Sequence, residues 1–208
     1  MKVIVYGDSH SSMGWPFGDP NLLPLELTQH YYGPLLCYTL GKKQWQVMDI
    51  TVFNDVEDDT ICIFCFGEID CRCHVKKHIT EENTYQNIID DLIFNYLETV
   101  KLNIEKTKKK VTTYIYNVVP PSKESEVSSI QKEFPFEGTD EERKSYTLYF
   151  NQKLKEMCLK YGFGFFDVYD YYATEEGFLN RNLSDLNVHV RDGKYLSKFL
   201  KENIRNDK

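Results

Sequence analysis

The sequence lacks long apolar runs, an excess of basic residues, internal repeats and low-complexity tracts. No stretch approaches the ~20 apolar residues that span a bilayer. The first apolar run ends at Tyr6 after only about five residues, so we expect no secretory signal peptide. The net charge of −7 argues against a nucleic-acid-binding protein, because such domains usually carry a clear basic excess. We therefore expect a cytoplasmic protein with no membrane span and no nucleic-acid partner.

The six cysteines are expected to be thiols rather than disulfides, as is usual for a cytoplasmic protein. Cys62 and Cys65 are an odd number of positions apart on one predicted strand, so their side chains should face opposite sides of a sheet. Buried thiols that act as small apolar groups are the favoured interpretation, and we expect no metal ion and no cofactor. A zinc site is the alternative, and its ligands would be Cys71, Cys73, His74 and His78.

A chain of 208 residues is long enough for one well-buried domain, which we expect to cover residues 1–208. The run from Ile61 to Phe66 is apolar throughout, as is typical of a parallel strand covered on both faces. Five segments are predicted to be strands: Lys2–Tyr6, Trp45–Val52, Thr60–Phe66, Val111–Val118 and Gly164–Asp167.

Helical patterns lie between the predicted strands. We expect one to open at Gly33-Pro34 and run through Leu40, and a long one to be capped by Thr80. A third opens on a capping box at Thr139 and runs to about Leu159, and the last extends from Asp192 to about Ile204. This alternation predicts a three-layer α/β/α sandwich around a five-stranded parallel sheet. The two long loops, 13–28 and 120–138, are expected to be lids or binding walls.

Three polar clusters follow or precede these predicted elements. Gly7-Asp8-Ser9-His10 comes directly after the first strand, and Gly67–Arg72 comes directly after the most hydrophobic one. The third cluster, Asp185–His189, precedes the last helix. Ligands bind at the carboxyl edge of open α/β sheets, and all three clusters can be placed there. Their convergence would create an active site.

The residue types in these clusters suit nucleophilic catalysis. Ser9 would be the nucleophile, His189 the base that takes its proton, and Asp185 the carboxylate that orients the imidazole. The chain order Ser, Asp, His is also that of α/β hydrolases. The alternatives are a simple turn at Asp8-Ser9 and a surface histidine beside a helix-capping aspartate. The three clusters together favour catalysis.

The second cluster places several charges at the end of a core strand. Glu68, Asp70 and Arg72 would be costly there unless they are paired or functional. One interpretation is a structural pair between Asp70 and Arg72 that braces the loop. In the other, Arg72 binds a carboxylate or phosphate through two parallel hydrogen bonds.

Together the three clusters resemble the motifs of the SGNH/GDSL hydrolase superfamily. Gly7-Asp8-Ser9 matches the first block of that family, Gly67-Glu68-Ile69-Asp70 its Gly-x-Asn-Asp block, and Asp185–His189 its Asp-x-x-His block. Gly33 matches the glycine whose amide contributes to the oxyanion hole. The resemblance covers the whole chain and implies an SGNH-hydrolase-like, flavodoxin-like fold. It also implies that the Ser9 and Gly33 amides bind the oxyanion.

The sequence departs from the family pattern in two places. Ile69 stands where the family has an asparagine that donates to the oxyanion, and the loss of one such donor typically costs about a hundred- to a thousandfold in rate. Cys71, Arg72 and Asn187 are candidates to replace it. The second departure is one extra residue between Asp185 and His189.

The resemblance leads to one main functional hypothesis: an SGNH-like serine hydrolase or acyltransferase that acts on ester (O-acyl) groups, with a carbohydrate as their carrier. Its partner would be that carbohydrate or a small ester. Besides Ser9, Asp185, His189 and Gly33, further residues are expected to bind substrate or brace the site: Asp8, His10, Gly67, Glu68, Asp70 and Arg72.

Two other functions remain open. Residues 67–74 resemble a divergent branch of the family that is associated with surface-glycan assembly, which implies a glycosyltransferase that uses a sugar nucleotide. His189, Asp8 or Asp70 would then be the base, and Arg72 would bind the diphosphate. Aromatic residues of the 13–28 loop, such as Trp15 and Phe17, would stack on sugar or base. The third possibility is a glycan-binding module without catalysis.

Overall fold

The computed structural model describes residues 1–128 and 132–204, and its centre is a five-stranded sheet. The strands run in the order β2-β1-β3-β4-β5, and every neighbouring pair is parallel. This arrangement confirms the predicted five-stranded parallel sheet. The strands are β1 (Lys2–Gly7), β2 (Glu26–Tyr31), β3 (Ile61–Cys65), β4 (Thr112–Tyr116) and β5 (Gly164–Phe166).

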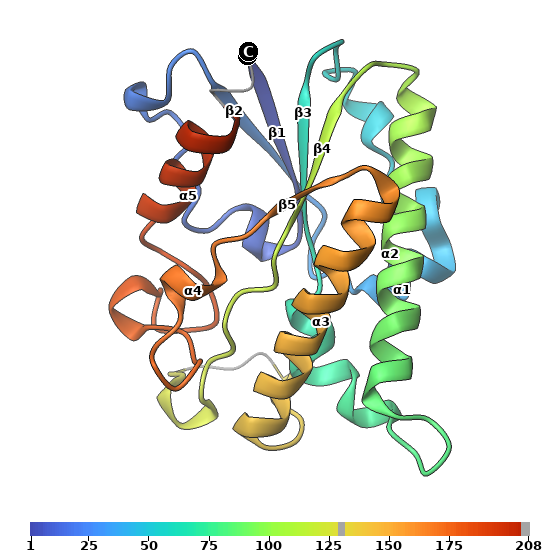
Figure 1. Ribbon diagram of the computed structural model, residues 1–208, viewed down its shortest axis with the longest axis vertical. Helices are drawn as coiled ribbons and strands as arrows, with labels where there is room; N and C mark the ends of the chain where they lie inside the picture. The colour runs from blue at the N-terminus through green and yellow to red at the C-terminus, as the bar shows by residue number, and fades with distance from the viewer. Residues whose placement is uncertain (129–131, 205–208) are drawn as a thin grey trace.

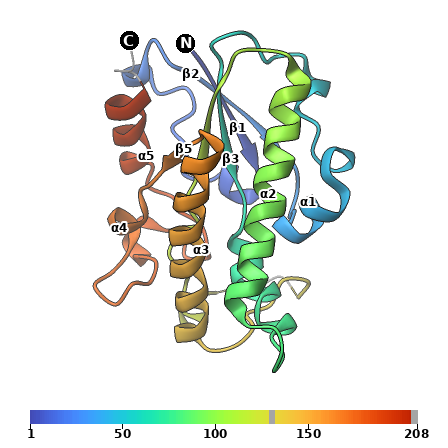
Figure 2. The ribbon, with the colours of Figure 1, turned by 45° about the vertical axis from the view of Figure 1, so that its right-hand side comes forward.

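Helices cover both faces of the sheet, as the three-layer prediction requires (Figure 1). The group α1, α2 and α3 packs on one face, and α4 and α5 pack on the other, which Figure 2 shows from a second direction. The bounds are α1 Cys37–Lys43, α2 Tyr85–Thr107, α3 Asp140–Tyr161, α4 Tyr169–Tyr172 and α5 Lys194–Phe199. Within the described residues, no helix is both long and apolar enough to cross a bilayer.

Side chains of the central strands alternate between two cores. Tyr6 and Cys62 face the core beneath α1, α2 and α3, whereas Val5 and Cys65 face the core beneath α4 and α5. The expectation that Cys62 and Cys65 point to opposite sides is therefore confirmed. Both central strands are buried on both faces, which explains their continuous apolar sequence.

The helix starts follow local capping chemistry. Thr139 forms the predicted capping box: its hydroxyl accepts the Glu142 amide at 3.2 Å, and the Glu142 carboxylate accepts the Thr139 amide at 2.8 Å. The prediction that Thr80 caps α2 is wrong, because Thr84 occupies that position. The Thr80 hydroxyl instead accepts the amide of Asn83 in the turn before the helix.

The prediction for the second strand is wrong. Residues 26–31 form β2, although they were expected to belong partly to a loop, and the Trp45–Val52 segment contains short 3-10 turns instead of a strand. In that segment Met48 and Ile50 are fully buried. The Ile50 amide donates to Asn103 Oδ1 of α2 at 3.0 Å, so these apolar residues anchor a connection to a helix.

The remaining boundaries shift by a few residues. The helix expected to open at Gly33-Pro34 begins at Cys37. The final helix starts at Lys194, whose backbone amide donates to Asp192 Oδ1 at 3.0 Å. A π-helical turn, η9 (Leu200–Ile204), then extends α5 to the predicted end.

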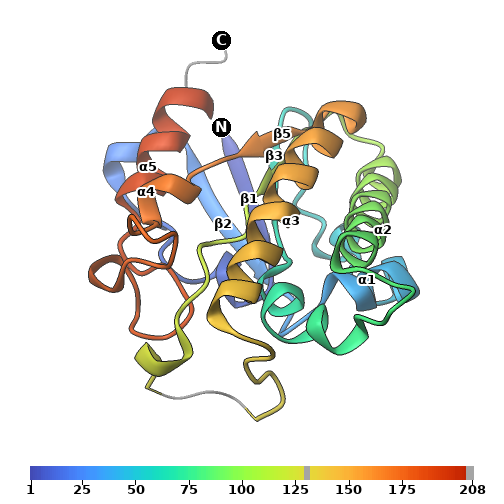
Figure 3. The same ribbon diagram turned by 60° about the horizontal axis from the view of Figure 1, so that its bottom comes forward.

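The strand order creates a switch point between β1 and β3. From β1 the chain continues to β2 on one side, and from β3 it continues to β4 on the other, so the loops that follow β1 and β3 diverge. Such a divergence leaves a crevice at the carboxyl ends of the two strands, where ligands bind in open α/β sheets. Figure 3 turns this end of the sheet toward the viewer.

Replacing Gly41 by alanine should destabilise the protein, although the same change in an exposed helix interior stabilises by about 1 kcal/mol. A Cβ added at Gly41 of α1 would lie 2.5 Å from the Asn95 Cβ of α2. Overpacking of this kind costs about 1–3 kcal/mol, so urea unfolding should show a lower free energy of unfolding. The control Lys43→Ala, at an exposed position of the same helix, should change it little. A variant at Gly41 as stable as the wild type would contradict this packing.

Candidate active site

Ser9 lies at the start of a 3-10 turn, η1 (Ser9–Ser11), directly behind β1. The turn requires glycine at position 7, because a Cβ there would lie 2.4 Å from the Cys65 carbonyl oxygen of β3. Asp8 caps the turn, and its Oδ1 accepts the His10 amide at 2.9 Å. The serine hydroxyl is thus presented at the switch point of the sheet.

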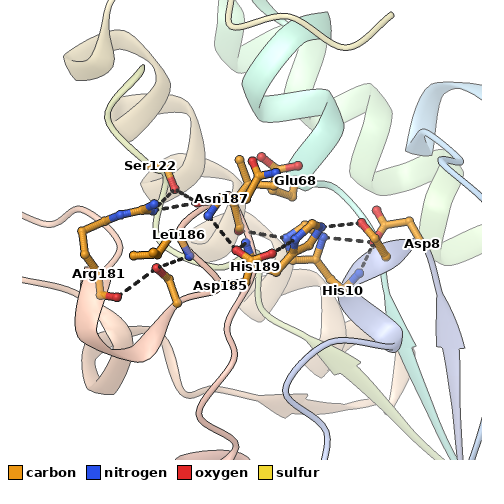
Figure 4. Close-up of polar contacts among 12 residues, drawn as sticks. Asp8, His10, Glu68, Ser122, Arg181, Asp185, Leu186, Asn187 and His189 are labelled. Carbon is orange, nitrogen blue, oxygen red and sulfur yellow. Dashed lines mark hydrogen bonds and ion pairs between the residues drawn. The ribbon is translucent and has the colours of Figure 1, made fainter. Parts of the chain in front are cut away.

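The structure brings the three predicted triad residues together. The Ser9 Oγ lies 2.8 Å from His189 Nε2, and His189 Nδ1 lies 2.7 Å from Asp185 Oδ2. Figure 4 shows the Asp185 and His189 side chains in contact beside the residues of the first cluster. Both distances are within hydrogen-bonding range, so a continuous chain of hydrogen bonds joins alcohol, imidazole and carboxylate.

The loop between Asp185 and His189 contains one unusual backbone conformation. Leu186 has a φ of 63°, in the left-handed region. Around it, Asp185 Oδ1 accepts the Asn187 amide at 2.8 Å and the His189 amide at 3.2 Å. The carboxylate therefore holds its own loop together while its other oxygen bonds to the imidazole.

A second set of contacts fixes the middle of this loop. The Asn187 carbonyl oxygen accepts hydrogen bonds from Ser122 Oγ at 2.8 Å and from an Arg181 guanidinium nitrogen at 2.6 Å, as Figure 4 shows. Both donors were missed by the sequence analysis, since neither forms part of a recognisable motif. The loop that bears the histidine is consequently held from two other segments of the chain.

The protonation states suit a serine–histidine pair. Burial lowers the pKa of His189, and the neighbouring His10 lowers it further, so the imidazole is below its ordinary pKa despite its bond to Asp185. Burial opposes ionisation of Asp185, but hydrogen bonds from the His189 ring and the Asn187 amide keep its pKa below the usual range. At neutral pH the histidine is therefore neutral and the aspartate is charged.

Asp8 and His10 lie behind the serine. His10 is buried, and its Nδ1 is 3.1 Å from Asp8 Oδ1. Neither residue lines the cavity next to Ser9 described below. The expectation that they contact substrate is not supported, because their side chains bond to each other and to the loop of the triad histidine.

Arg72 pairs with Glu68, not with Asp70 as one interpretation had it. Its Nε lies 2.7 Å from Glu68 Oε1, and its Nη2 lies 3.2 Å from Glu68 Oε2. The remaining terminal nitrogen donates to the Phe134 carbonyl oxygen. Burial would raise the pKa of Glu68, but Arg72 and His10 hold it below its ordinary value. The guanidinium thus braces two loops through its bonds to Glu68 and to the Phe134 carbonyl oxygen.

Asp70 supports a helix. It is fully buried, and its carboxylate accepts the amides of Cys37 at 2.7 Å and Tyr38 at 3.3 Å, the first two residues of α1. These amides lack partners within the helix, so a carboxylate there satisfies them. Burial raises the pKa of Asp70 to about 7. Its expected role in substrate binding is not supported by this position.

The two glycines of the prediction have different roles. Gly67 has a φ of 115°, and a Cβ there would lie 2.9 Å from Phe150 and Val118, so this position requires glycine for conformation and packing. Gly33 has a φ of 75°, and a Cβ added there would point into open space. In the chain it lies between Tyr31 and Pro34, which both line the cavity next to Ser9.

A cavity of about 170 Å³ opens beside Ser9 and His189. Its walls combine apolar and polar side chains. The loop over residues 120–138 contributes one wall, as expected of a binding wall, although residues 129–131 of that loop lie outside the described residues. Other lining residues are Tyr31, Pro34, Ile69, Arg72, Phe134, Phe136, Asn187 and Val188.

No known family model and no curated protein matches this sequence. Solved structures do match. A GDSL-like lipase from Bacteroides thetaiotaomicron has a TM-score of 0.60 at 13% identity, and the match covers 100% of this chain and 89% of that chain. A member of the lipolytic G-D-S-L family from Veillonella parvula has a TM-score of 0.55 at 14% identity, covering 99% of each chain. The chain has the SGNH/GDSL-hydrolase fold.

Two side chains of the 13–28 loop expected to stack on a ligand instead belong to the interior of this SGNH/GDSL-hydrolase fold. Trp15 is buried against Tyr116 and Phe166, and its indole nitrogen donates to the His10 carbonyl oxygen at 2.9 Å. Phe17 packs against the same core. These contacts hold the loop that follows the serine turn.

The alternative zinc site is not formed. Cys71 and Cys73 are buried. The His74 ring instead lies 4.3 Å from that of His78 and 4.5 Å from that of Tyr38, measured between centroids. Across residues 1–128 and 132–204, no group of three or more histidine, cysteine or acidic side chains could hold a metal ion.

Breaking the buried pair between Arg72 and Glu68 should be costly. The change Arg72→Met leaves the Glu68 carboxylate buried without its partner, so urea unfolding should show a loss of about 3–5 kcal/mol. Adding Glu68→Leu to the same chain should recover most of the loss, because no uncompensated charge remains. The control Lys101→Met removes the exposed partner of Glu105 and should change stability little. Equal losses in the single and double variants would contradict the pairing.

Proposed function

We propose that the protein is a serine hydrolase that cleaves carboxylic esters. The observation that carries this proposal is the chain of hydrogen bonds from Ser9 Oγ to His189 Nε2 and from His189 Nδ1 to Asp185. Solved structures with the same fold include lipases and a phospholipase A1 from Streptomyces albidoflavus, which supports ester chemistry.

The mechanism follows from the order of these contacts. Ser9 Oγ attacks the ester carbonyl carbon while its proton passes to His189 Nε2. Asp185 stabilises the imidazolium that forms and keeps its ring oriented. The imidazolium then donates its proton to the leaving alcohol, and an acyl group remains on Ser9. Water activated by the same histidine releases the acid and restores the serine.

The oxyanion of the tetrahedral intermediate needs donors near Ser9. The backbone amides of Ser9 and Gly33 make no hydrogen bond to any described residue, so both are free to donate. The position of the family's asparagine donor is Ile69, which lines the same cavity with an apolar side chain. A third donor must therefore come from another residue.

Asn187 is the best of the three candidates to replace it. The Cys71 thiol is buried, and Arg72 directs its nitrogens to Glu68 and Phe134. Asn187 lines the cavity with Ser9, and its side-chain amide has no hydrogen-bond partner among the described residues. The extra residue in the triad loop and the loss of the family asparagine are then complementary changes.

The cavity indicates a short acyl group. Its volume of about 170 Å³ is below the ~300–1,000 Å³ of pockets that enclose drug-sized ligands, and Ile69, Phe134 and Phe136 contribute apolar surface to its walls. The Tyr31 ring at its edge is 56% exposed and could lie against a larger leaving group. An O-acyl group on a carbohydrate stays our prediction, as does transfer of the acyl group to an acceptor alcohol.

Among the described residues, two observations weigh against the glycosyltransferase hypothesis. A diphosphate leaving group needs unpaired cations, yet Arg72 is paired with Glu68. Trp15, one of the side chains expected to stack on a sugar or base, is buried.

The cytoplasmic location also stays a proposal, supported by six cysteines that are buried free thiols.

A fluorophosphonate probe should form a covalent adduct on Ser9, because the histidine activates this hydroxyl. Ser9→Ala should abolish labelling and lower kcat on p-nitrophenyl acetate by about 10⁴- to 10⁶-fold. Peptide mass spectrometry locates the adduct. Ser12→Ala, in the same segment, should keep both labelling and turnover. An unlabelled wild-type protein beside a labelled control esterase would remove Ser9 as nucleophile.

Removing the amide of Asn187 should impair the chemical step. Asn187→Ala is expected to lower kcat by about a hundred- to a thousandfold with a smaller change in KM, because an oxyanion donor acts on the transition state. Steady-state kinetics on the same ester measure this split. Asn182→Ala, at an exposed position of the same region, should leave kcat unchanged. Full kcat in Asn187→Ala would show that the third donor lies elsewhere.

A further inference from the structure

His10 occupies a buried position where both of its ring nitrogens face hydrogen-bond acceptors. Its Nδ1 is 3.1 Å from Asp8 Oδ1, and its Nε2 is 3.3 Å from the Val188 carbonyl oxygen. Only 6% of the residue is exposed. A neutral imidazole carries a single N–H donor, so only the imidazolium can make both bonds. The geometry therefore selects the charged form of this ring.

Three titratable groups lie close to this ring. Asp8 precedes it in the turn after β1, Glu68 comes from the loop after β3, and His189 comes from the C-terminal loop. The pKa of His10 would fall on burial, but Asp8 and Glu68 outweigh that effect and raise it above the ordinary value. Arg72 neutralises part of the Glu68 charge through its ion pair.

The rings of His10 and His189 are in contact. Their centroids are 4.8 Å apart, and their planes are tilted by 49° (Figure 4). A like charge at this distance disfavours a second proton, so a charged His10 makes protonation of His189 harder. The bond from His10 to the Val188 carbonyl also ties the residue before His189 to the turn that bears Ser9.

We propose that His10 is a buried imidazolium that keeps its neighbour His189 in the neutral form able to accept the serine proton. His10 is a positioning residue, because it does not line the cavity that Ser9 lines and its ring bonds to Asp8 and to the Val188 carbonyl oxygen. The proposal rests on the proposed hydrolase function. It gives a reason for the second histidine directly after the serine. On this proposal, His10 sets the lowest pH at which the enzyme is active, because it lowers the pKa of His189.

The pH profile of kcat/KM provides the first test. His189 must be neutral to act, so activity should rise with pH, and its midpoint in the wild type should lie below the ordinary histidine pKa of about 6.5. His10→Asn and His10→Gln each remove the charge and should move this midpoint upward. The ratio of kcat/KM at pH 5.5 to that at pH 8 should then fall on the order of tenfold.

The matched control is His78→Asn, which removes a histidine from an exposed position outside the site and should leave the profile in place. Circular dichroism establishes that each variant folds. Folded His10 variants with an unmoved profile would overturn the proposal.

The second test needs no activity. In the wild-type protein labelled with ¹⁵N histidine, the ring nitrogens of His10 should both have protonated shifts at pH 7, while His189 should have neutral ones. Asp8→Asn should lower the pH at which His10 loses its proton, because the carboxylate favours the cation. A neutral His10 at pH 7 would overturn the proposal. Absence of esterase activity beside a charged His10 would instead remove only the proposed function.

Discussion

The parallel pairing of β1 with β3 is the constraint on which the rest of the site depends. Gly7 lies opposite Cys65 in this pair, and the Asp8 amide donates to the Cys65 carbonyl oxygen at 3.3 Å, so the serine turn begins where β3 ends. Only a residue without a side chain fits at Gly7. Because both strands are buried on both faces, the turn after one and the loop after the other are fixed relative to each other.

Much of the fold could be predicted because buried parallel strands have an unmistakable composition. β1 and β3 were found from their apolar runs and α3 from its capping box, and the segments of β4 and β5 were also predicted as strands. β2 was missed because it is an edge strand whose residues are mostly exposed, so it carries no apolar signature. The Trp45–Val52 segment resembled a strand because Met48 and Ile50 are buried, but they pack beside α2 without a neighbouring strand.

Within the site, motif recognition located the serine, aspartate and histidine, because the order of their motifs along the chain and their places relative to the predicted strands match the SGNH/GDSL pattern. The partner of Arg72 was harder to predict. Residues 68–74 are helical, so Glu68 and Arg72, four positions apart, lie on one side, whereas Asp70 points toward α1. A helical interpretation of that block would have found the pair. The free amide of Asn187 depends on tertiary contacts from Ser122 and Arg181, which no local pattern reveals.

The bonds from Ser9 to His189 and from His10 to Val188 connect segments about 180 positions apart in the chain. In the proposed mechanism the serine, which leaves the ribosome first, gains its base only after the distant loop has been synthesised and has docked. Fraying of that loop in the finished protein would remove the base while the sheet stays intact. The proposed reactivity would in this sense be a late product of folding, acquired only when both segments have met.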